Sequence, residues 1–312
     1  MRGRLTKKRD HMKLSARLLC LPFALVGLLA LVTACGADES PGDDDADQPT
    51  EPAPTAFAVD STMGKLAAAG KLTVGVKFDQ PGFGLKDPVS GQVDGFDVAL
   101  AREIGKALGL AEDDIEFVEA VSQDRIPFLA EGKVDLVVAT MSITAERRAQ
   151  IEFSRPYFLA GQSILVKREN STIAKVEDLN GKTVCSVQGS TSEQNLRSKA
   201  PQANLQSLTT YAACVDGMKN ARYEAVSTDD IILAAFAASD ASLKLVGGQF
   251  TQEPYGVGLP KGKTDMAQFV NSLIAKWLAD GTWDRLYNQY LGKVEGLPKA
   301  AEARGRLPAT AP

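Results

Sequence analysis

Apolar residues follow two spacings that alternate along residues 60–297. Runs rich in β-branched residues, such as LTVGV at 72–76, are typical of strands, whereas residues 97–108 repeat apolar positions at the spacing of a helix. The alternation continues with strands expected at 115–121 and 135–139, and with helices at 125–131 and from 145. Strands that alternate with helices predict an α/β fold with a largely parallel sheet.

The series starts again after the turn signal Asn180-Gly181. The second series predicts strands at 183–187, 224–227, 243–246 and 255–259, and helices near 193, at 211–219, from 230, at 265–279 and at 283–290. The last residues, 298–312, read PKAAEARGRLPATAP and are expected to form a disordered tail.

The N-terminal segment has the pattern of an export signal. Fifteen apolar residues, Leu18 to Val32, follow a cluster of Lys and Arg and are shorter than the ~20 residues that span a bilayer. The sequence LVTACG at 31–36 resembles a bacterial lipobox, which predicts removal of signal peptide 1–34 and acylation of Cys35. An ordinary signal cut near Ala34 is the alternative, and Met12 fits as a start as well as Met1 does.

An acidic, proline-rich segment follows Cys35. Residues 37–55 contain seven acids, four prolines and neither Lys nor Arg. Such a composition cannot bury enough apolar surface to fold, so we interpret 35–59 as a lipidated Cys and an extended tether that holds a soluble body away from a membrane. A spacer without that role is the alternative.

Composition and charge exclude several functions. The chain has 312 residues, 44% of them hydrophobic, which fits one or two globular domains. Without residues 1–34 it carries 28 basic and 38 acidic residues, a net charge of −10, so it lacks the basic footprint of a nucleic-acid binder. The only histidine is His11, so a processed chain excludes a Ser-His-Asp triad and a His-ligated zinc. We expect neither a metal nor a cofactor.

Two cysteines remain in the body of the chain, Cys185 and Cys214. Because an exported protein meets an oxidising environment, we expect a disulfide between them rather than two free thiols. Closing that loop would contribute roughly 3 to 4 kcal/mol to stability.

Polar residues collect where the predicted strands end. Because ligands of open α/β sheets bind beyond the carboxyl ends of the strands, these residues are candidates for a site. They are Lys77, Thr140, Ser142, Thr191 and Asp229, with Arg125 at the start of a helix. Together they suit a small zwitterion with extra negative charge. Taken singly, Lys77 and Arg125 also fit solvated surface residues, and Asp229 fits a helix N-cap.

Arg147 is the most informative of the candidate residues. Thr144 is a plausible N-cap, which places Arg147 in the first helical turn, where the helix dipole favours anions over cations. A bound carboxylate would reconcile the two through a bidentate guanidinium contact. A surface arginine paired with Glu146 fits equally well.

Three motifs then resemble a known family. GFDVALA at 95–101, SITAER at 142–147 and FSRPY at 153–157 are similar to motifs of the family 3, amino-acid-binding class of extracellular solute-binding proteins that serve ABC importers. The resemblance covers about Lys65 to Leu291. It implies a two-lobed, type II periplasmic-binding-protein-like fold, in which each lobe is a mainly parallel sheet flanked by helices and the ligand cleft lies between the lobes.

The resemblance also implies boundaries and head-group roles. Lobe 1 would comprise 60–160 and 255–297, and lobe 2 would be 161–254. Arg147 would bind the ligand's α-carboxylate and Asp229 its ammonium. Thr140, Ser142 and Thr191 would supply hydroxyl or backbone contacts.

The side-chain end resembles the glutamate- and aspartate-binding branch. Its signs are VGVK ending at Lys77 and SQDRIP at 122–127, which implies that Lys77, Ser122 and Arg125 meet the distal carboxylate. A lysine at 77, where some members carry arginine, makes a bidentate contact there doubtful. Phe83 and Phe96 either pack on the ligand's methylenes or belong to the core. The surroundings of Cys185 resemble actinobacterial glutamate-receptor lipoproteins.

We therefore expect a monomeric, lipid-anchored lipoprotein on the extracytoplasmic face of the cell membrane. It would capture L-glutamate, with aspartate second, and deliver it to a permease and ATPase. Within the binding class the alternative is glutamine, asparagine or a broad range of polar amino acids. Other classes are a dehydratase-like enzyme on the same fold and a sensing or scaffold lipoprotein.

Overall fold

The computed structural model describes residues 57–308. The predicted signal peptide, Cys35 and nearly all of the predicted tether lie outside these residues. Among the described residues, no helix has the length and apolar character that a membrane span requires.

The first of two five-stranded sheets has the order β5-β1-β6-β15-β7. β1 runs parallel to β5 and β6, and β15 runs antiparallel to β6 and β7. Their bounds are Leu72–Val76 for β1, Ile115–Glu119 for β5, Leu136–Val137 for β6, Glu152–Phe153 for β7 and Gly258–Leu259 for β15. The parallel strands point their carboxyl ends to one edge of this sheet.

The second sheet has the order β11-β10-β12-β9-β13 and repeats the plan. β10 is parallel to β11 and β12, whereas β9 pairs antiparallel with β12 and β13. The bounds are Gln162–Lys167 for β9, Thr183–Val187 for β10, Asn204–Leu208 for β11, Ala225–Asp229 for β12 and Leu243–Val246 for β13. In both sheets, three neighbouring parallel strands form one side and antiparallel pairing adds the other two strands.

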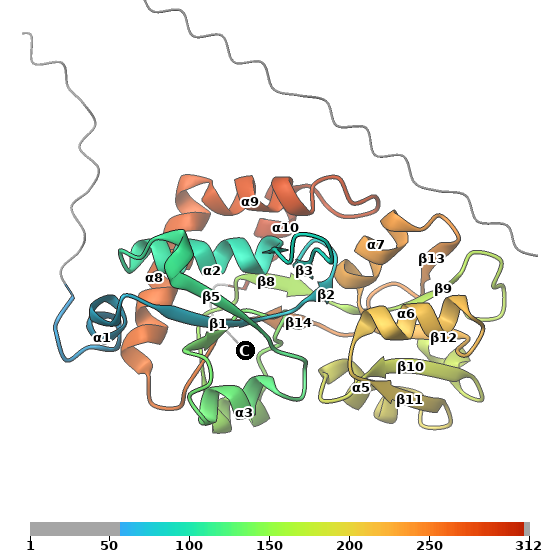
Figure 1. Ribbon diagram of the computed structural model, residues 1–312. Coiled ribbons are helices and arrows are strands. Elements are labelled where there is room, and N and C mark those ends of the chain that lie inside the picture. Colours follow the sequence, from blue (N-terminus) through green and yellow to red (C-terminus); the bar gives the residue numbers. More distant parts are fainter. Residues whose placement is uncertain (1–56, 309–312) are drawn as a thin grey trace, which may run out of the picture. The chain divides into compact units, whose positions relative to one another are not determined.

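Two short strands connect the sheets. β8 (Phe158–Ala160) leads from the first sheet into β9, β14 (Glu253–Tyr255) leads back toward β15, and the two pair antiparallel. Figure 1 shows this pair between the two sheets. The chain therefore crosses twice at one place, which confirms the two-lobed fold class.

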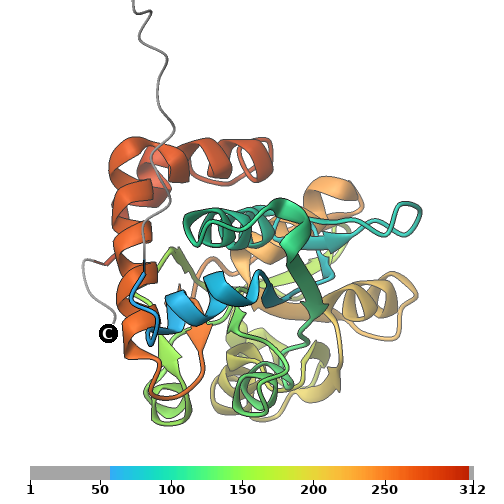
Figure 2. The same ribbon diagram turned by 60° about the vertical axis from the view of Figure 1, so that its left-hand side comes forward.

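Helices flank both sheets and follow the predicted series. The first sheet has α1 (Thr62–Ala69), α2 (Phe96–Ala107), α3 (Arg125–Ala130), α4 (Ala145–Gln150), α8 (Thr264–Asp280) and α9 (Thr282–Tyr290), with the short helix Glu112–Asp114. The second has α5 (Thr191–Lys199), α6 (Tyr211–Lys219) and α7 (Asp230–Ser239), with the short helix Val176–Leu179. In Figure 2, α1 lies beside α8, where Asp265 accepts hydrogen bonds from the backbone N–H and hydroxyl of Thr62 at 2.7 and 2.8 Å.

A small antiparallel sheet stands next to α2. It has the order β2-β3-β4, with β2 at Asp79–Gln80, β3 at Gly84–Lys86 and β4 at Val93–Asp94. β2 follows β1 after two residues, so this sheet belongs structurally to the first five-stranded sheet and its helix α2.

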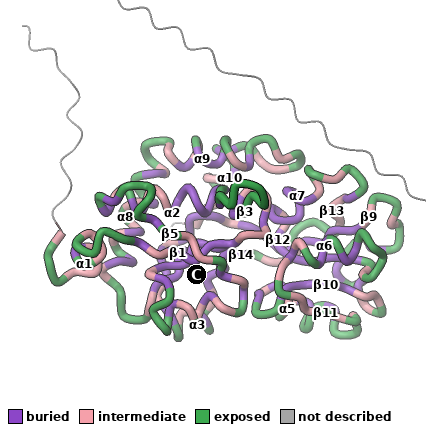
Figure 3. Tube along the Cα trace, in the orientation of Figure 1, coloured by how far each residue is buried: buried purple, intermediate pink, exposed green. Residues whose placement is uncertain are grey.

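The apolar residues of the strands are buried and form the core with these helices, and Figure 3 shows the buried segments. An aromatic cluster joins the first sheet to the crossing strands. Phe158 stacks on Tyr255 and Tyr287 with ring centroids 5.7 and 6.2 Å apart, and Trp283 donates a hydrogen bond to the carbonyl of Tyr157 at 2.8 Å. The cluster fixes the crossing strands against α9.

The prediction of a disordered tail over 298–312 is wrong for its first part. Ala300–Gly305 forms α10, which buries Ala300 and Ala303 against the core. The Tyr287 hydroxyl donates to the carbonyl of Pro298 at 2.7 Å, and Arg304 pairs with Asp284 at 2.9 Å. Ala300 and Ala303 are three residues apart and form the buried face of α10. The segment as a whole is polar, so the sequence did not indicate a helix there.

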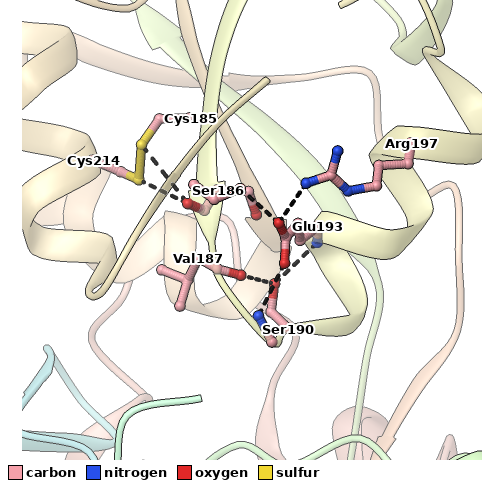
Figure 4. Close-up of polar contacts among 9 residues, drawn as sticks. Cys185, Ser186, Val187, Ser190, Glu193, Arg197 and Cys214 are labelled. Atoms are coloured by element: carbon pink, nitrogen blue, oxygen red, sulfur yellow. Dashed lines mark hydrogen bonds and ion pairs between the residues drawn. A yellow bond between two sulfur atoms is a disulfide. The ribbon is translucent and has the colours of Figure 1, made fainter. Parts of the chain in front are cut away.

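The expected disulfide is present, since Cys185 in β10 is bonded to Cys214 in α6. Figure 4 shows both sulfurs beside the carbonyl oxygen of Ser186, 3.4 Å from the sulfur of Cys214. The bond ties α6 to β10, which lies between β11 and β12 in the second sheet.

Candidate functional site

A small polar pocket with a cavity volume of about 10 Å³ lies where strand ends of the two sheets face each other. The segments that follow β5 and β6 line one side, and those that follow β10, β11 and β12 line the other. The lining residues are Ser122, Arg125, Thr140, Ser190, Thr191, Ser192, Tyr211, Thr228, Asp229 and Ile232. Five of the predicted site residues are among them, in the place that the strand-end rule indicates.

Arg147 lies in the first turn of α4 and bonds to Gly189, the neighbour of the lining residue Ser190. The Thr144 hydroxyl accepts the Arg147 N–H at 3.2 Å, so Thr144 is the N-cap as predicted. The guanidinium donates to the carbonyl of Ser142 at 2.8 Å and, across the pocket, to that of Gly189 at 3.1 Å. Three of its five N–H donors remain for a ligand. The alternative, an exposed pair with Glu146, does not occur among the ion pairs of the described chain, and Arg147 is buried.

Asp229 supplies the anion on the opposite side. One carboxylate oxygen, Oδ2, accepts a hydrogen bond from the Tyr255 hydroxyl at 2.5 Å. The other oxygen, Oδ1, is buried and has no hydrogen-bond partner among the described residues. Burial and the nearby Glu253 raise the pKa of Asp229 well above its usual value. Asp229 occupies the N-cap position of α7, as the alternative expected, but its side chain makes no capping hydrogen bond, so Oδ1 is left for a cationic donor.

Lys77 and Arg125 form a second cluster on the first-sheet side. Lys77 Nζ donates to the Ser122 hydroxyl at 2.9 Å. Arg125 donates from Nε to the Ser122 carbonyl at 3.2 Å and from Nη1 to the carbonyls of Ala139 at 3.0 Å and Thr140 at 3.4 Å. Both residues are only 2% exposed, so neither is a solvated surface residue.

These cations have no carboxylate partner close by. None of the ion pairs between residues 57 and 308 involves Lys77, Arg125 or Arg147. Burial, and then the charge of Arg125, lowers the pKa of Lys77 to about 7. Burial, and then the charge of Arg147, lowers the pKa of Arg125 to about 9. An anion in the pocket would relieve both effects.

The predicted hydroxyl residues Thr140, Ser142 and Thr191 all form side-chain hydrogen bonds. Ser142 and Thr191 place their hydroxyl oxygens 3.3 Å apart across the pocket. Thr191 also donates to Glu253 at 2.9 Å. The backbone of Thr140 has φ 45°, which is rare for a β-branched residue, and its hydroxyl donates to Gln80 at 3.0 Å.

Asp97 of the GFDVALA motif holds that unusual backbone, a role that sequence reasoning missed. It accepts the N–H of Thr140 at 2.7 Å and the hydroxyl of Tyr157 at 2.9 Å. Burial raises the pKa of Asp97 to about 7, and these two hydrogen bonds oppose the shift. The sequence did contain a signal for this role, because Asp97 is an acidic residue on the apolar side of a predicted helix. Tyr255 and Glu253 were also missed, since only the fold brings them to Asp229 and Thr191.

Phe83 and Phe96 do not line the pocket. Both are fully buried in the aromatic cluster, with ring centroids 6.1 Å apart, and Phe83 also meets Tyr255 at 6.2 Å. Their surroundings fit the core alternative, and a contact with ligand methylenes stays a prediction.

The loop after β10 is shaped for close approach, as Figure 4 shows for its hydrogen bonds. Ser190 caps α5 by accepting the Glu193 N–H at 3.0 Å, and Glu193 accepts the Gly189 N–H at 2.9 Å. Gly189 has φ 77°, and a Cβ there would lie 2.8 Å from the Cα of Gln123. Glycine therefore lets this loop touch the Ser122 segment of the first sheet and present its carbonyl to Arg147.

Comparisons with known proteins agree with this geometry. The family of bacterial extracellular solute-binding proteins, family 3, matches residues 72–293. The ABC transporter glutamine-binding protein GlnH of Bacillus subtilis is 38% identical over 271 residues, covering 86% of this chain and 95% of the relative. The glutamate-binding protein GluB of Corynebacterium glutamicum is 34% identical over 287 residues, covering 86% and 90%.

Solved structures give the same fold. An ancestral arginine-binding protein bound to glutamine is 38% identical, with TM-score 0.68 over 72% of this chain and 99% of that one. The ancestral amino acid-binding protein AncCDT-1, a precursor of cyclohexadienyl dehydratase, is 36% identical, with TM-score 0.68 over 74% and 99%. The chain therefore belongs to the bacterial extracellular solute-binding proteins of family 3, the amino-acid receptors of ABC transporters.

Proposed function

We propose that this protein captures L-glutamate, with aspartate second, and presents it to an ABC permease. The observation that carries the proposal is the pair Lys77 and Arg125, two buried cations without a carboxylate partner at one end of the pocket. Burying an unpaired cation is costly, and an anionic ligand side chain offsets that cost.

The head group would be held by the other two charged residues. Arg147 keeps three N–H donors for the α-carboxylate, and the unpartnered Oδ1 of Asp229 would accept the ammonium. Ser142, Thr140 and Thr191 would add hydroxyl or backbone contacts. Glutamate has two carboxylates and one ammonium, which matches this set of charges.

Selectivity would come from the distal carboxylate. It would meet Lys77 Nζ, with the Ser122 hydroxyl beside it, and the Arg125 N–H groups that carry no hydrogen bond to the protein. Glutamine would place a neutral amide there and leave buried cations unpaired, which disfavours it.

Glutamine is the second candidate, and one observation favours it. A pKa of about 7 for Lys77 means that this residue loses its proton near neutral pH, and a neutral amine tolerates an amide. GlnH, named as a glutamine-binding protein, is also among the relatives.

The assembly around the binding body is part of the proposal. Signal peptide 1–34 would be removed, Cys35 acylated, and 35–59 would tether a monomeric body to the extracytoplasmic face of the membrane. Lobe 1 (60–160 and 255–297) and lobe 2 (161–254) would close on the ligand about β8 and β14. Only a closed, loaded receptor would engage the permease and its ATPase.

We infer binding without turnover. The one acid that lines the pocket, Asp229, is anchored by Tyr255, and an ammonium contact accounts for its other oxygen. Proton NMR of glutamate or prephenate with the purified protein should show no product over hours. Product formation would support the dehydratase-like alternative instead.

Isothermal titration of residues 36–312 tests the ligand. The protein is first unfolded and refolded to remove bound amino acid, and is then titrated with glutamate, aspartate, glutamine, asparagine and arginine. We expect one-to-one binding that is tightest for glutamate and much weaker for glutamine. Tighter binding of glutamine would overturn the side-chain assignment, and absence of binding would overturn the receptor.

A further inference from the structure

Asp79 reaches from the first sheet's side to a helix of the second sheet. Its carboxylate Oδ2 accepts the backbone N–H of Tyr211 at 2.8 Å and approaches that of Ala212 at 3.4 Å. Asp79 belongs to β2, two residues beyond β1, whereas α6 packs on β10, β11 and β12 (Figure 1). This contact joins residues 132 positions apart in the chain.

The contact completes the N-terminal cap of α6. The hydroxyl of the helix's own N-cap, Thr210, accepts the N–H of Ala213 at 3.3 Å. The N–H groups of Tyr211 and Ala212 would otherwise lack a partner inside the helix. A carboxylate at a helix N-terminus is favoured by both the free N–H groups and the helix dipole. The second sheet therefore presents a binding point for an anion, and the first sheet supplies the anion.

We propose that Asp79 is a latch that stabilises the closed cleft without touching the ligand. Movement of one sheet away from the other about β8 and β14 separates Asp79 from α6, so the bond exists only in the closed form. A contact made in one state alone shifts the equilibrium toward that state. The free energy of the contact between Asp79 and α6 then adds to the ligand's binding free energy, although Asp79 does not line the pocket.

The position of α6 ties the latch to the site. Tyr211, whose N–H Asp79 accepts, also lines the pocket, and one turn later Cys214 is bonded to Cys185 in β10. The disulfide thus keeps the helix N-terminus fixed relative to the strand whose end carries the Ser190 loop. Opening and closing therefore move the N-terminus of α6, to which Asp79 bonds, and this wall of the pocket as one body.

The latch acts equally on every ligand, and this separates it from an electrostatic effect on Lys77. Asp79 and Glu119 both favour the charged form of Lys77, but no hydrogen bond joins Glu119 to α6 within residues 57–308. Glu119→Gln is therefore a matched control that changes the electrostatics alone. The inference rests on the closure assumed in the proposed function, but not on glutamate as the ligand.

The experiment titrates Asp79→Ala, Asp79→Asn, Glu119→Gln and the wild type with the two amino acids that the wild type binds best. We expect Asp79→Ala to weaken both by the same factor, roughly tenfold. Asp79→Asn keeps an acceptor and should lose about threefold. Glu119→Gln should remain within about twofold of the wild type. Small-angle X-ray scattering should show that Asp79→Ala still contracts at saturating ligand.

Two results would overturn the latch. One is wild-type affinity in Asp79→Ala, and the other is a loss confined to acidic ligands and shared by Glu119→Gln. Thermal unfolding followed by circular dichroism checks that the variants are folded. If Asp79→Ala does not fold, Asp79→Asn alone decides, because unchanged affinity there with both ligands contradicts a charge-assisted cap.

Discussion

The two ends of the pocket are built differently. At the head-group end, Arg147 comes from the first sheet and Asp229 from the second, and their partners Gly189 and Tyr255 lie across the pocket or on a crossing strand. At the side-chain end, Lys77, Ser122 and Arg125 all follow strands of the first sheet and bond to one another or to nearby carbonyls.

The difference separates two tasks. Groups that straddle the cleft come together only when it closes, so the head-group end couples recognition to closure. Groups held within one lobe keep their arrangement whether the cleft is open or closed, so the side-chain end can select the ligand before closure. Substitutions at the first end should affect every amino acid, and substitutions at the second should change preference.

The largest effect is expected at the head-group end. Arg147→Ala removes a cation that bonds to carbonyls on the sides of both sheets, and in the proposed assignment it leaves the ligand's α-carboxylate buried without a partner. We expect binding of every amino acid to fall more than a hundredfold, in line with about 3 to 5 kcal/mol for breaking a buried pair. Titration calorimetry measures the loss.

Arg148→Ala is the control for this variant. It removes a cation from the next position of the same helix, but among residues 57–308 the Arg148 side chain has no hydrogen bond to Ser142 or Gly189. Its affinity should match that of the wild type. If Arg147→Ala loses affinity for glutamate but keeps its affinity for glutamine, Arg147 belongs to the side-chain end. The division of the pocket into a head-group end and a side-chain end is then wrong.

The second effect concerns preference. Lys77→Met removes a cation from the side-chain end and keeps a long, flexible side chain. The ratio of glutamate to glutamine affinity should fall by roughly thirtyfold, which corresponds to about 2 kcal/mol for one partner of a buried charged contact. Competition titrations with both amino acids give the ratio.

Lys71→Met provides the matched comparison, since Lys71 is an exposed lysine paired with Glu116. It should leave the ratio unchanged. An equal loss of both ligands in Lys77→Met, with normal folding, would show that Lys77 supports the head group instead.

Much of the fold follows from periodicity, but the short elements do not. β1 is found at the predicted bounds and α2 differs from the prediction by one residue at each end, because long regular patterns leave little choice. The strand predicted at 255–259 is instead β14 and β15, which pair in different sheets. Two- and three-residue strands are set by their tertiary partners, which a single sequence does not display.

The site divides in the same way. Charged residues at strand ends could be found from sequence, because a parallel sheet brings those ends together. Glu253 and Tyr255 could not, since each acts through a partner at least 26 positions away. Phe83 and Phe96 stay open, because an aromatic ring suits a ligand and a core equally well.

The third effect is a proton linkage at the side-chain end. In the empty pocket burial and Arg125 hold the pKa of Lys77 at about 7, against the weaker pull of Asp79 and Glu119. A bound distal carboxylate favours the charged amine and raises that pKa. At pH 8 glutamate binding should therefore take up a proton, and its affinity should fall by roughly tenfold between pH 6 and pH 8.

Titrations in phosphate and in Tris at pH 8 measure this uptake, because the two buffers differ in ionisation enthalpy. Glutamine should show far less uptake. Lys77→Met should abolish the linkage, whereas Asp97, whose pKa is also raised to about 7, stays in place as an internal control. Uptake that persists in Lys77→Met would assign the proton to another group.

The smallest effect on binding is expected for substitutions in the aromatic cluster around Phe83, which packs behind both ends of the pocket. Phe83→Leu loses ring contacts with Phe96, Phe158 and Tyr255 but touches neither subsite directly. We expect the free energy of unfolding to fall by about 1 to 2 kcal/mol, while affinity for the best ligand stays within about twofold. Urea unfolding and calorimetry give the two quantities, and Phe96→Leu should behave alike. A tenfold loss of affinity at unchanged stability would place Phe83 on the ligand after all, and the side-chain end would then extend into what the structure shows as core.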